Sequence, residues 1–163
     1  MSKKKKSSAE ESVNVFPVIR NKKARFNFQL LEKLEAGIAL RGTEVKSLRQ
    51  GKASLEEAYA RIRSGELYLI GCHISEYDHG NMQNHEPTRP RKLLVHRREL
   101  NKIESRLSQK GLTLVPVRIY FKHGLAKVEI AIASGKTLSD KRDKLKTQQM
   151  DRDASREIKR FQR

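Results

Sequence analysis

The sequence predicts a mainly β domain with short helices. Apolar residues recur in short alternating runs through the middle of the chain, a pattern typical of half-buried strands. Glycine-containing turn signals separate these runs, and only two stretches show the spacing of an amphipathic helix. Apolar residues become sparse toward both ends, where charged residues are dense. We therefore expect about six strands, two to three helices and a charged segment on each side.

The strands are predicted from alternation and from the turns that bound them. Ser64-Gly65 is a hairpin signal between two runs, and Lys122–Gly124 joins the last two. Pro116 lies inside a run, and because proline donates no ladder hydrogen bond we expect an edge position or a bulge there. The six predicted strands are 36–40, 59–62, 67–70, 92–95, 112–121 and 126–132.

Two helices are predicted from their end signals. The first covers residues 43–51, with Thr43 as its cap residue, an acid in the first turn and a terminal glycine. The second covers residues 98–110, carries an apolar stripe at positions i, i+3 and i+7, and stops at Gly111. Residues 54–57 also match a capping box and would start a third helix, but the following hairpin signal favours a strand.

A closed sheet is the architecture that best fits this many short strands, because closure leaves no exposed sheet edge. We expect an OB-like closed β-barrel over residues 14–134. Residues 1–13 form a Lys/Ser/Glu segment with almost nothing to bury, so we expect a disordered basic N-terminal segment. Residues 135–163 form a basic C-terminal tail that we expect to be disordered alone.

The charge of the chain indicates a polyanionic partner. Lys and Arg number 36 against 19 Asp and Glu, which gives a net charge of +17. Nucleic acid and an anionic membrane surface both fit, but no apolar run reaches the roughly 18–20 residues needed to span a bilayer. No secretory leader is recognised, and the single Cys72 allows no intrachain disulfide, so we expect a cytoplasmic protein.

A search for catalytic or metal-binding patterns finds little. The five histidines are isolated and have no cysteine partner at zinc-ligand spacing, and no phosphate-binding loop or nucleophile elbow occurs. Asp78, His79 and His85 would in principle supply the general base of a nuclease, but a polar surface loop is the more ordinary reading. We therefore expect no enzyme, no metal and no cofactor.

Three basic clusters favour nucleic acid, since arginine grips phosphate bidentately. They lie in residues 20–26, in residues 46–52 and in residues 89–92. The chain has no helix-turn-helix or zinc-finger pattern for a DNA groove, whereas a barrel with exposed Tyr and Phe suits folded RNA. RNA is therefore the predicted partner.

Several strings resemble the small protein B family, the SsrA-binding proteins of bacterial trans-translation. The longest is Gly42–Ala53, and the resemblance runs in the same order and spacing from about Asn14 to the C-terminus. The other strings are 21–25, 35–38, 89–94, 110–116, Gly135-Lys136 and 140–142.

The resemblance implies an OB-like barrel that binds the tRNA-like domain of transfer-messenger RNA. With elongation factor Tu, which it meets through the RNA, such a protein brings that RNA to stalled ribosomes. The barrel stands in for the anticodon arm, and the tail, helical on the ribosome, probes the decoding centre and the empty mRNA channel. The implied RNA contacts are Asn21, Lys22, Arg25, Glu35, Lys46, Ser47, Lys52, Arg89, Arg91, Leu94 and Lys127. The implied ribosome-binding residues of the tail are Gly135, Lys136, Asp140, Lys141, Arg142 and Ile158.

This chain departs from the family pattern in its tail. Ser139 stands where many members carry an aromatic residue or His, and Thr137 stands where a second Lys is common. Two other functions remain open on the sequence. One is an integral ribosomal or rRNA-maturation protein, and the other is a metal-independent RNase that uses the region His73–His85.

Overall fold

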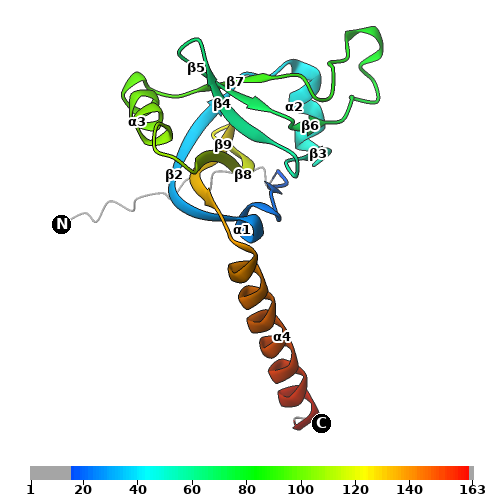
Figure 1. The fold of residues 1–163 in the computed structure, drawn as a ribbon. Helices are drawn as coiled ribbons and strands as arrows, with labels where there is room; N and C mark the ends of the chain where they lie inside the picture. The colour runs from blue at the N-terminus through cyan, green and yellow to red at the C-terminus, as the bar shows by residue number, and fades with distance from the viewer. Residues whose placement is uncertain (1–15, 162–163) are drawn as a thin grey trace, which may run out of the picture.

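The structure is a computed structural model that describes residues 16–161. Our expectation for the N-terminal segment 1–13 lies outside these residues. Figure 1 shows a strand-rich body with one long helix leaving it. The strands are β1 (Ile19–Arg20), β2 (Phe28–Ile38), β3 (Ala53–Ser54), β4 (Tyr59–Arg63), β5 (Glu66–Ile70), β6 (His73–Ile74), β7 (Arg91–Leu94), β8 (Leu112–Lys122) and β9 (Leu125–Gly135). The helices are α1 (Ala24–Asn27), α2 (Gly42–Arg49), the 3₁₀ turn η1 (Asn81–Gln83), α3 (Arg97–Leu107) and α4 (Leu138–Phe161).

Six strands close into a ring. Their order is β8-β4-β5-β7-β2-β9, and β9 pairs back onto β8, so the sheet has no free end. Every pairing is antiparallel, β1 adds to the side of β8, and β3 pairs with β6 in a separate small sheet. The prediction of a closed, mainly β fold of about six strands is confirmed.

The core lies inside the ring because alternate side chains of each strand point inward. Leu69, Ile119 and Ile130 are fully buried there. Helices α2 and α3 each add one apolar face to this cluster, through Leu48 and Ile103 respectively. The outward side chains are therefore free to carry charge.

Both predicted turns are present. Ser64 and Gly65 have φ of +49° and +71°, and His123 and Gly124 have +51° and +75°. Two successive positive φ values match the type I′ turn, whose twist fits the flanking strands. Residues 54–57 do not start a helix, so the preferred hairpin is confirmed.

Two strands depart from regular pairing. The β8–β9 register shifts between Pro116 and Arg118, which is the bulge that the proline predicts. Strand β2 begins at Phe28, eight residues before the predicted strand at Ala36, and its register shifts between Leu30 and Glu32. Leu31 is exposed while Glu32 is partly buried, so the apolar residues of this stretch do not alternate in the sequence and the strand was not recognised there.

Helix α2 begins one residue before the predicted cap. Thr43 is already inside the helix, and Arg41 is the flanking residue, whose amide donates a 2.6 Å hydrogen bond to the Glu44 carboxylate. This acid at the third helical position satisfies a backbone donor that has no partner within the helix.

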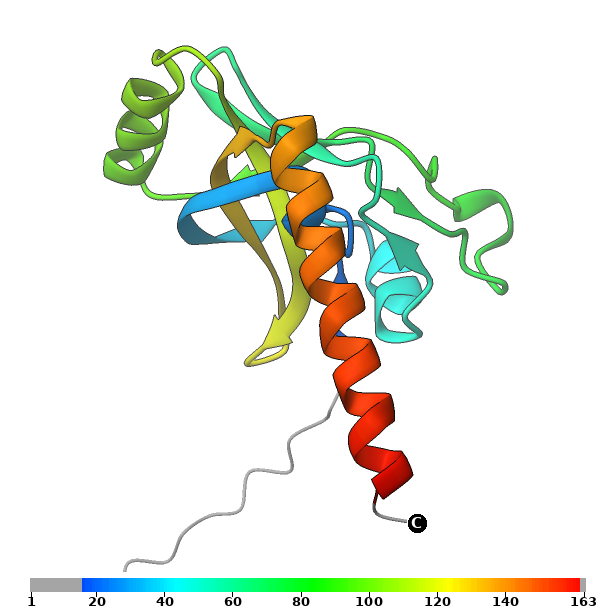
Figure 2. The ribbon, with the colours of Figure 1, turned by 60° about the horizontal axis from the view of Figure 1, so that its bottom comes forward.

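The C-terminal tail, which we expected to be disordered alone, is the helix α4 in this structure. Thr137 and Asp140 exchange hydrogen bonds between side chain and backbone at its start, a capping box that favours helix formation. No glycine or proline interrupts residues 138–161. Figure 1 shows α4 leaving beside α1 and running away from the ring, and in Figure 2, where the bottom of that view comes forward, α4 crosses in front of the ring. Within residues 16–161, no helix is long and apolar enough to cross a membrane.

Candidate nucleic-acid interface

Two carboxylates lie side by side on the outer face of β2 and β9. The strand register places Glu35 directly opposite Glu129, and Glu129 in turn opposite Arg118 of β8. Like charges at this spacing repel each other, so each carboxylate needs cations around it. Glu129 has them, because Arg118 Nη2 lies 2.7 Å and Lys33 Nζ 3.1 Å from its oxygens.

Glu35 is surrounded in the same way. The Tyr120 hydroxyl donates a hydrogen bond to its carboxylate, and Lys122 Nζ and Lys127 Nζ lie 3.4 and 3.9 Å away. The Tyr120 hydrogen bond, and after it Lys122 and Lys127, keep the pKa of Glu35 below its ordinary value despite partial desolvation. Burial together with the Glu35 carboxylate raises the pKa of Tyr120 to about 12. Glu35 therefore stays ionised and orients one hydroxyl and two ammonium groups on the surface.

Three of the predicted contacts meet in a surface hollow of about 560 Å³ between β2, β7 and β9. These are Glu35, Leu94 and Lys127. Leu94 is 54% exposed, which is unusual for a leucine on a barrel strand. A Cβ added at Gly37 would come within 3.2 Å of the Leu94 side chain, so the glycine keeps room beside it. The lining of the hollow combines apolar side chains with the carboxylates of Glu35 and Glu99 and the ammonium group of Lys127, so it offers an RNA base both an apolar surface and polar acceptors and a donor.

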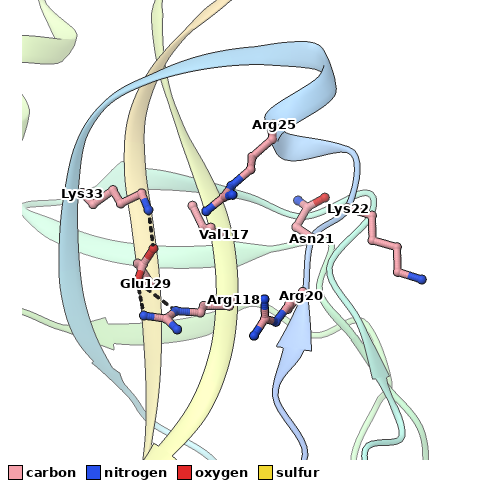
Figure 3. A pocket seen from close by; sticks show the side chains of 8 residues that line it. All are labelled: Arg20, Asn21, Lys22, Arg25, Lys33, Val117, Arg118 and Glu129. Carbon is pink, nitrogen blue, oxygen red and sulfur yellow. Dashed lines mark hydrogen bonds and ion pairs between the residues drawn. The ribbon is translucent and has the colours of Figure 1, made fainter. Parts of the chain in front are cut away.

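A second hollow, of about 270 Å³, adjoins the same charged row. Figure 3 shows its lining, in which the guanidinium groups of Arg20, Arg25 and Arg118 approach one another while Lys22 points away. Arg118 and Lys33 are paired with Glu129, which leaves cationic charge in excess around the hollow. Such an arrangement suits phosphate oxygens.

Asn21 lies at the edge of this hollow but uses its side chain inside the protein. The side chain is buried, and Nδ2 donates to the carbonyls of Leu55 and Pro116 at 3.0 and 3.1 Å. Its Oδ1 accepts from the Ala24 amide at 3.1 Å and so provides a partner for the first backbone donor of the short helix α1. Asn21 therefore fixes the segment that presents Lys22 and Arg25.

A buried ion cluster holds two more of the predicted contacts, Arg89 and Arg91. Glu44 is completely buried and receives Arg91 Nε at 2.8 Å and Arg89 Nη2 at 2.5 Å. Burial by itself would raise the pKa of Glu44, but the Arg89 hydrogen bond, the Arg41 amide and the charge of Arg91 outweigh it and lower that pKa. Arg91 also donates to the carbonyls of Cys72 and Pro87, at 2.6 and 2.9 Å.

The predicted contacts in and around α2 and β7 differ in exposure. Lys46 and Lys52 are exposed on and just after α2, where Lys46 Nζ lies 5.0 Å from the centre of the Tyr77 ring and Lys52 pairs with Asp78 at 2.5 Å. Arg91 and Ser47 are buried, and within residues 16–161 the Ser47 hydroxyl has no hydrogen-bond partner. Arg89 is partly exposed.

The tail residues are mostly on the surface. Gly135 ends β9, Asp140 caps α4, and Arg142 and Ile158 are exposed, whereas Lys141 is half-buried. Lys136 and Lys144 both donate to the carbonyl of Arg25, at 3.2 and 2.8 Å. Burial and the nearby charges of Lys136 and Arg25 lower the pKa of Lys144. Hydrogen bonds therefore connect the start of α4 to the backbone of Arg25, whose side chain lines the second hollow.

Several surface residues were missed by the sequence analysis. Arg118, Tyr120 and Lys122 occupy alternate positions of β8 and therefore share one face, a signal that the alternation of that strand already carried. Arg20 joins them only through the register of β1 with β8, which no local pattern predicts.

Two members of the predicted general-base group, His85 and Asp78, are engaged in other contacts. His85 is buried, with Nδ1 3.0 Å from the Thr43 hydroxyl and Nε2 2.9 Å from the Ile74 carbonyl, so both ring nitrogens serve the fold. Asp78 is held by Lys52, and this ion pair lowers the pKa of its carboxyl.

Comparisons with known proteins point in one direction. The family model described as SmpB protein matches residues 18–160. An SsrA-binding protein of Solidesulfovibrio magneticus is 53% identical over 143 residues, covering 88% of this chain and 93% of that protein. An SsrA-binding protein of Syntrophobacter fumaroxidans is 48% identical over 160 residues, covering 98% of each chain.

A solved structure agrees with these relatives. It is described as "tmRNA-SmpB: a journey to the center of the bacterial ribosome" and superposes with a TM-score of 0.64 at 50% identity, covering 75% of this chain and 86% of that one. With the family model matching most of its length and relatives at about half identity, the chain belongs to the SmpB family.

Proposed function

We propose that this chain binds the tRNA-like domain of transfer-messenger RNA and delivers it to stalled ribosomes for trans-translation. The observation that carries the proposal is the pair of adjoining hollows on the β2–β9–β8 face, where predicted contacts from distant parts of the sequence come together. The relatives named SsrA-binding proteins and the structure of SmpB with transfer-messenger RNA support it.

Within this proposal the predicted contacts divide into two groups. Exposed side chains touch the RNA, while buried ones hold the contacting segments in place. The direct contacts are Lys22, Arg25, Glu35, Lys46, Lys52, Arg89, Leu94 and Lys127. The positioning residues are Asn21, Ser47 and Arg91.

The domain boundaries follow the same division. The proposed RNA-binding domain is 14–134 and the proposed ribosome-binding tail is 135–163, whose described helix α4 would enter the decoding centre and the empty mRNA channel. Elongation factor Tu meets the protein only through the RNA. The work takes place in the cytoplasm, where ribosomes translate, and it needs no catalytic group, metal or cofactor.

A band-shift titration tests the proposal. Full-length protein should bind a transcript of the tRNA-like domain much more tightly than an unstructured RNA of equal length. Log affinity should fall linearly with log salt, with a slope of roughly −0.7 to −0.9 for each phosphate neutralised. Equal affinity for the two RNAs would leave only nonspecific attraction and would refute the selective site. Incubation with labelled RNA in the same buffer separates binding from an RNase, because the RNA should remain intact.

A further inference from the structure

Among the predicted RNA contacts, only Leu94 lies on the outer face of β4, β5 and β7, at its edge. Their alternate residues point outward, and the register aligns them in rows across the three strands. Arg61 lies opposite Tyr68, and Tyr68 lies opposite Lys92. Tyr59, in the next row, is 44% exposed. Two aromatic rings are therefore interleaved with basic side chains on a sheet surface.

This face is continuous with the first hollow. Leu94, at the end of β7, pairs with Gly37 of β2, and both residues line that hollow. Lys92 lies two residues before Leu94 on the same side of β7, so the row through Tyr68 leads directly to the proposed RNA site. On the other side, a groove of about 550 Å³ opens between β4 and the end of α3, lined by Tyr59, Arg61 and apolar residues such as Leu107.

The charge of the face suits a polyanion. Arg61 and Arg63 are exposed on β4, and Lys92 is 43% exposed. One acid, Glu66, lies among them, and it is occupied by Lys92 Nζ at 2.5 Å and by the Tyr68 hydroxyl at 2.8 Å. The hydrogen bond from the Tyr68 hydroxyl to Glu66 restrains the position of the ring before any ligand arrives.

We propose that the outer face of β4, β5 and β7 binds two or three unpaired RNA nucleotides, whose bases stack on Tyr59 and Tyr68 while Arg61, Arg63 and Lys92 contact their phosphates. Base stacking on aromatic rings tolerates any base, and a basic surface follows the backbone, which is the usual way to hold single-stranded RNA. The inference rests on the proposed function, because it extends the same RNA-binding surface across the ring.

Fluorescence of a single introduced tryptophan tests the stacking. The natural chain has no tryptophan, so Tyr59→Trp reports on this face alone. Hexauridylate and hexaadenylate should quench this tryptophan. The control is Met82→Trp, at a fully exposed loop position, which should respond little. Equal responses of the two reporters, or no response of either, would overturn the proposal.

Affinity measurements on the full chain complete the test. The double variant Tyr59→Leu/Tyr68→Leu should weaken hexanucleotide binding by roughly 5- to 100-fold per ring lost. The double variant Tyr59→Phe/Tyr68→Phe keeps both rings and should retain most of the natural affinity. Matching circular dichroism melts ensure that folding is intact. Wild-type affinity of the leucine variant would refute the inference.

The tRNA-like domain serves as a second ligand for the same variants. If its affinity falls with that of the hexanucleotides, the unpaired nucleotides come from the transfer-messenger RNA. If only hexanucleotide binding falls, they come from another RNA, such as a message or rRNA. If wild-type protein binds the tRNA-like domain but no hexanucleotide, the inference fails and the proposed function stands. If it binds neither, the proposed function fails as well.

Discussion

Glu44 in the barrel and Asp140 in the tail begin their helices in the same way but differ in surroundings. Each carboxylate accepts a backbone N–H from the residue three positions earlier, Arg41 or Thr137. Glu44 is completely buried and holds two arginines, whereas Asp140 is exposed and holds only its own helix start. The same local motif is thus part of the rigid body in one region and an independent cap in the other.

The ion pairs of the two regions differ in the same way. Charges of the barrel pair across strands, as Glu129 does with Arg118 of the neighbouring hairpin arm and with Lys33, which is distant in sequence. Within the described residues of α4, the ion pair between Arg156 and Asp153 spans a single turn. A barrel held by long-range pairs presents a fixed surface, whereas α4 contacts the barrel at its base through Lys144 and makes local contacts farther along, so its far end can take its position from a partner.

The largest expected effect on stability distinguishes a buried glutamate of the barrel, Glu44, from an exposed glutamate of α4, Glu157. Glu44→Gln should lower the free energy of unfolding by about 3 kcal/mol or more, because Arg91 is left buried with an uncompensated charge. Glu157→Gln, on the exposed surface of α4, is the matched control and should leave stability unchanged. Urea unfolding followed by circular dichroism measures both. A Glu44 variant as stable as its control would show that the buried cluster is not structural.

Acidification should remove the same contribution. The pKa of Glu44 is lowered in the folded state, so the unfolded state binds its proton more readily. Its stabilisation is present above the unfolded-state value of about 4.3 and is lost as pH falls through the folded-state pKa. As the pH is lowered below about 4.3, the unfolding free energy of the natural chain should decrease, and that of the Glu44→Gln variant should decrease less steeply. Parallel pH dependences would contradict the assignment.

A smaller effect is expected where tail and barrel meet. Lys144→Gln removes one of the two ammonium groups that contact the Arg25 carbonyl, so the first turns of α4 should exchange their amide hydrogens faster. Lys146→Gln, on the exposed side of the same helix, should not change them. Hydrogen exchange with mass spectrometry reads the difference. If the two variants behave alike, the contact does not hold α4.

The smallest effect on stability is expected at Glu35. Glu35→Gln keeps the shape of the side chain but no longer attracts Lys122 and Lys127, so the affinity for the tRNA-like RNA should fall several-fold while the melting temperature hardly changes. Lys102 pairs with a partly exposed acid on the same strand, Glu32, and Glu32→Gln is the matched control. A fall in melting temperature without a fall in affinity would make Glu35 a structural residue.

The sequence predicted the elements that depend on local chemistry. Both hairpin turns need positive φ, which glycine adopts without steric cost, so Gly65 and Gly124 predict the turns directly from the sequence. The bulge at Pro116 follows equally directly from the missing donor. The first half of β2 was missed because an apolar residue, Leu31, is exposed there and an acid, Glu32, is partly buried, so the sequence does not alternate; its pairing partner, β9, also lies far away in the sequence.

The sequence predicted which residues belong to the candidate site, but it did not predict which of them are buried or how they pair. The strings that resemble the SmpB family name Arg91 and Ser47 together with Lys46, but nothing local tells a buried position from an exposed one. Burial of Arg91 depends on Glu44, which folds against it from a distant segment. The pairing of Glu35 with Glu129 likewise depends on strand register, which is a property of the whole ring.

The central claim is that the barrel binds the RNA and the tail serves the ribosome. Ending the chain at Lys136 tests it most directly, because this keeps all of β9 and one of the two contacts to Arg25. Band shifts with the tRNA-like RNA and peptide tagging on stalled ribosomes are measured side by side for the full and shortened chains. The account predicts nearly unchanged RNA affinity and no tagging. Loss of RNA affinity together with tagging would contradict it, since the tail would then be part of the RNA site.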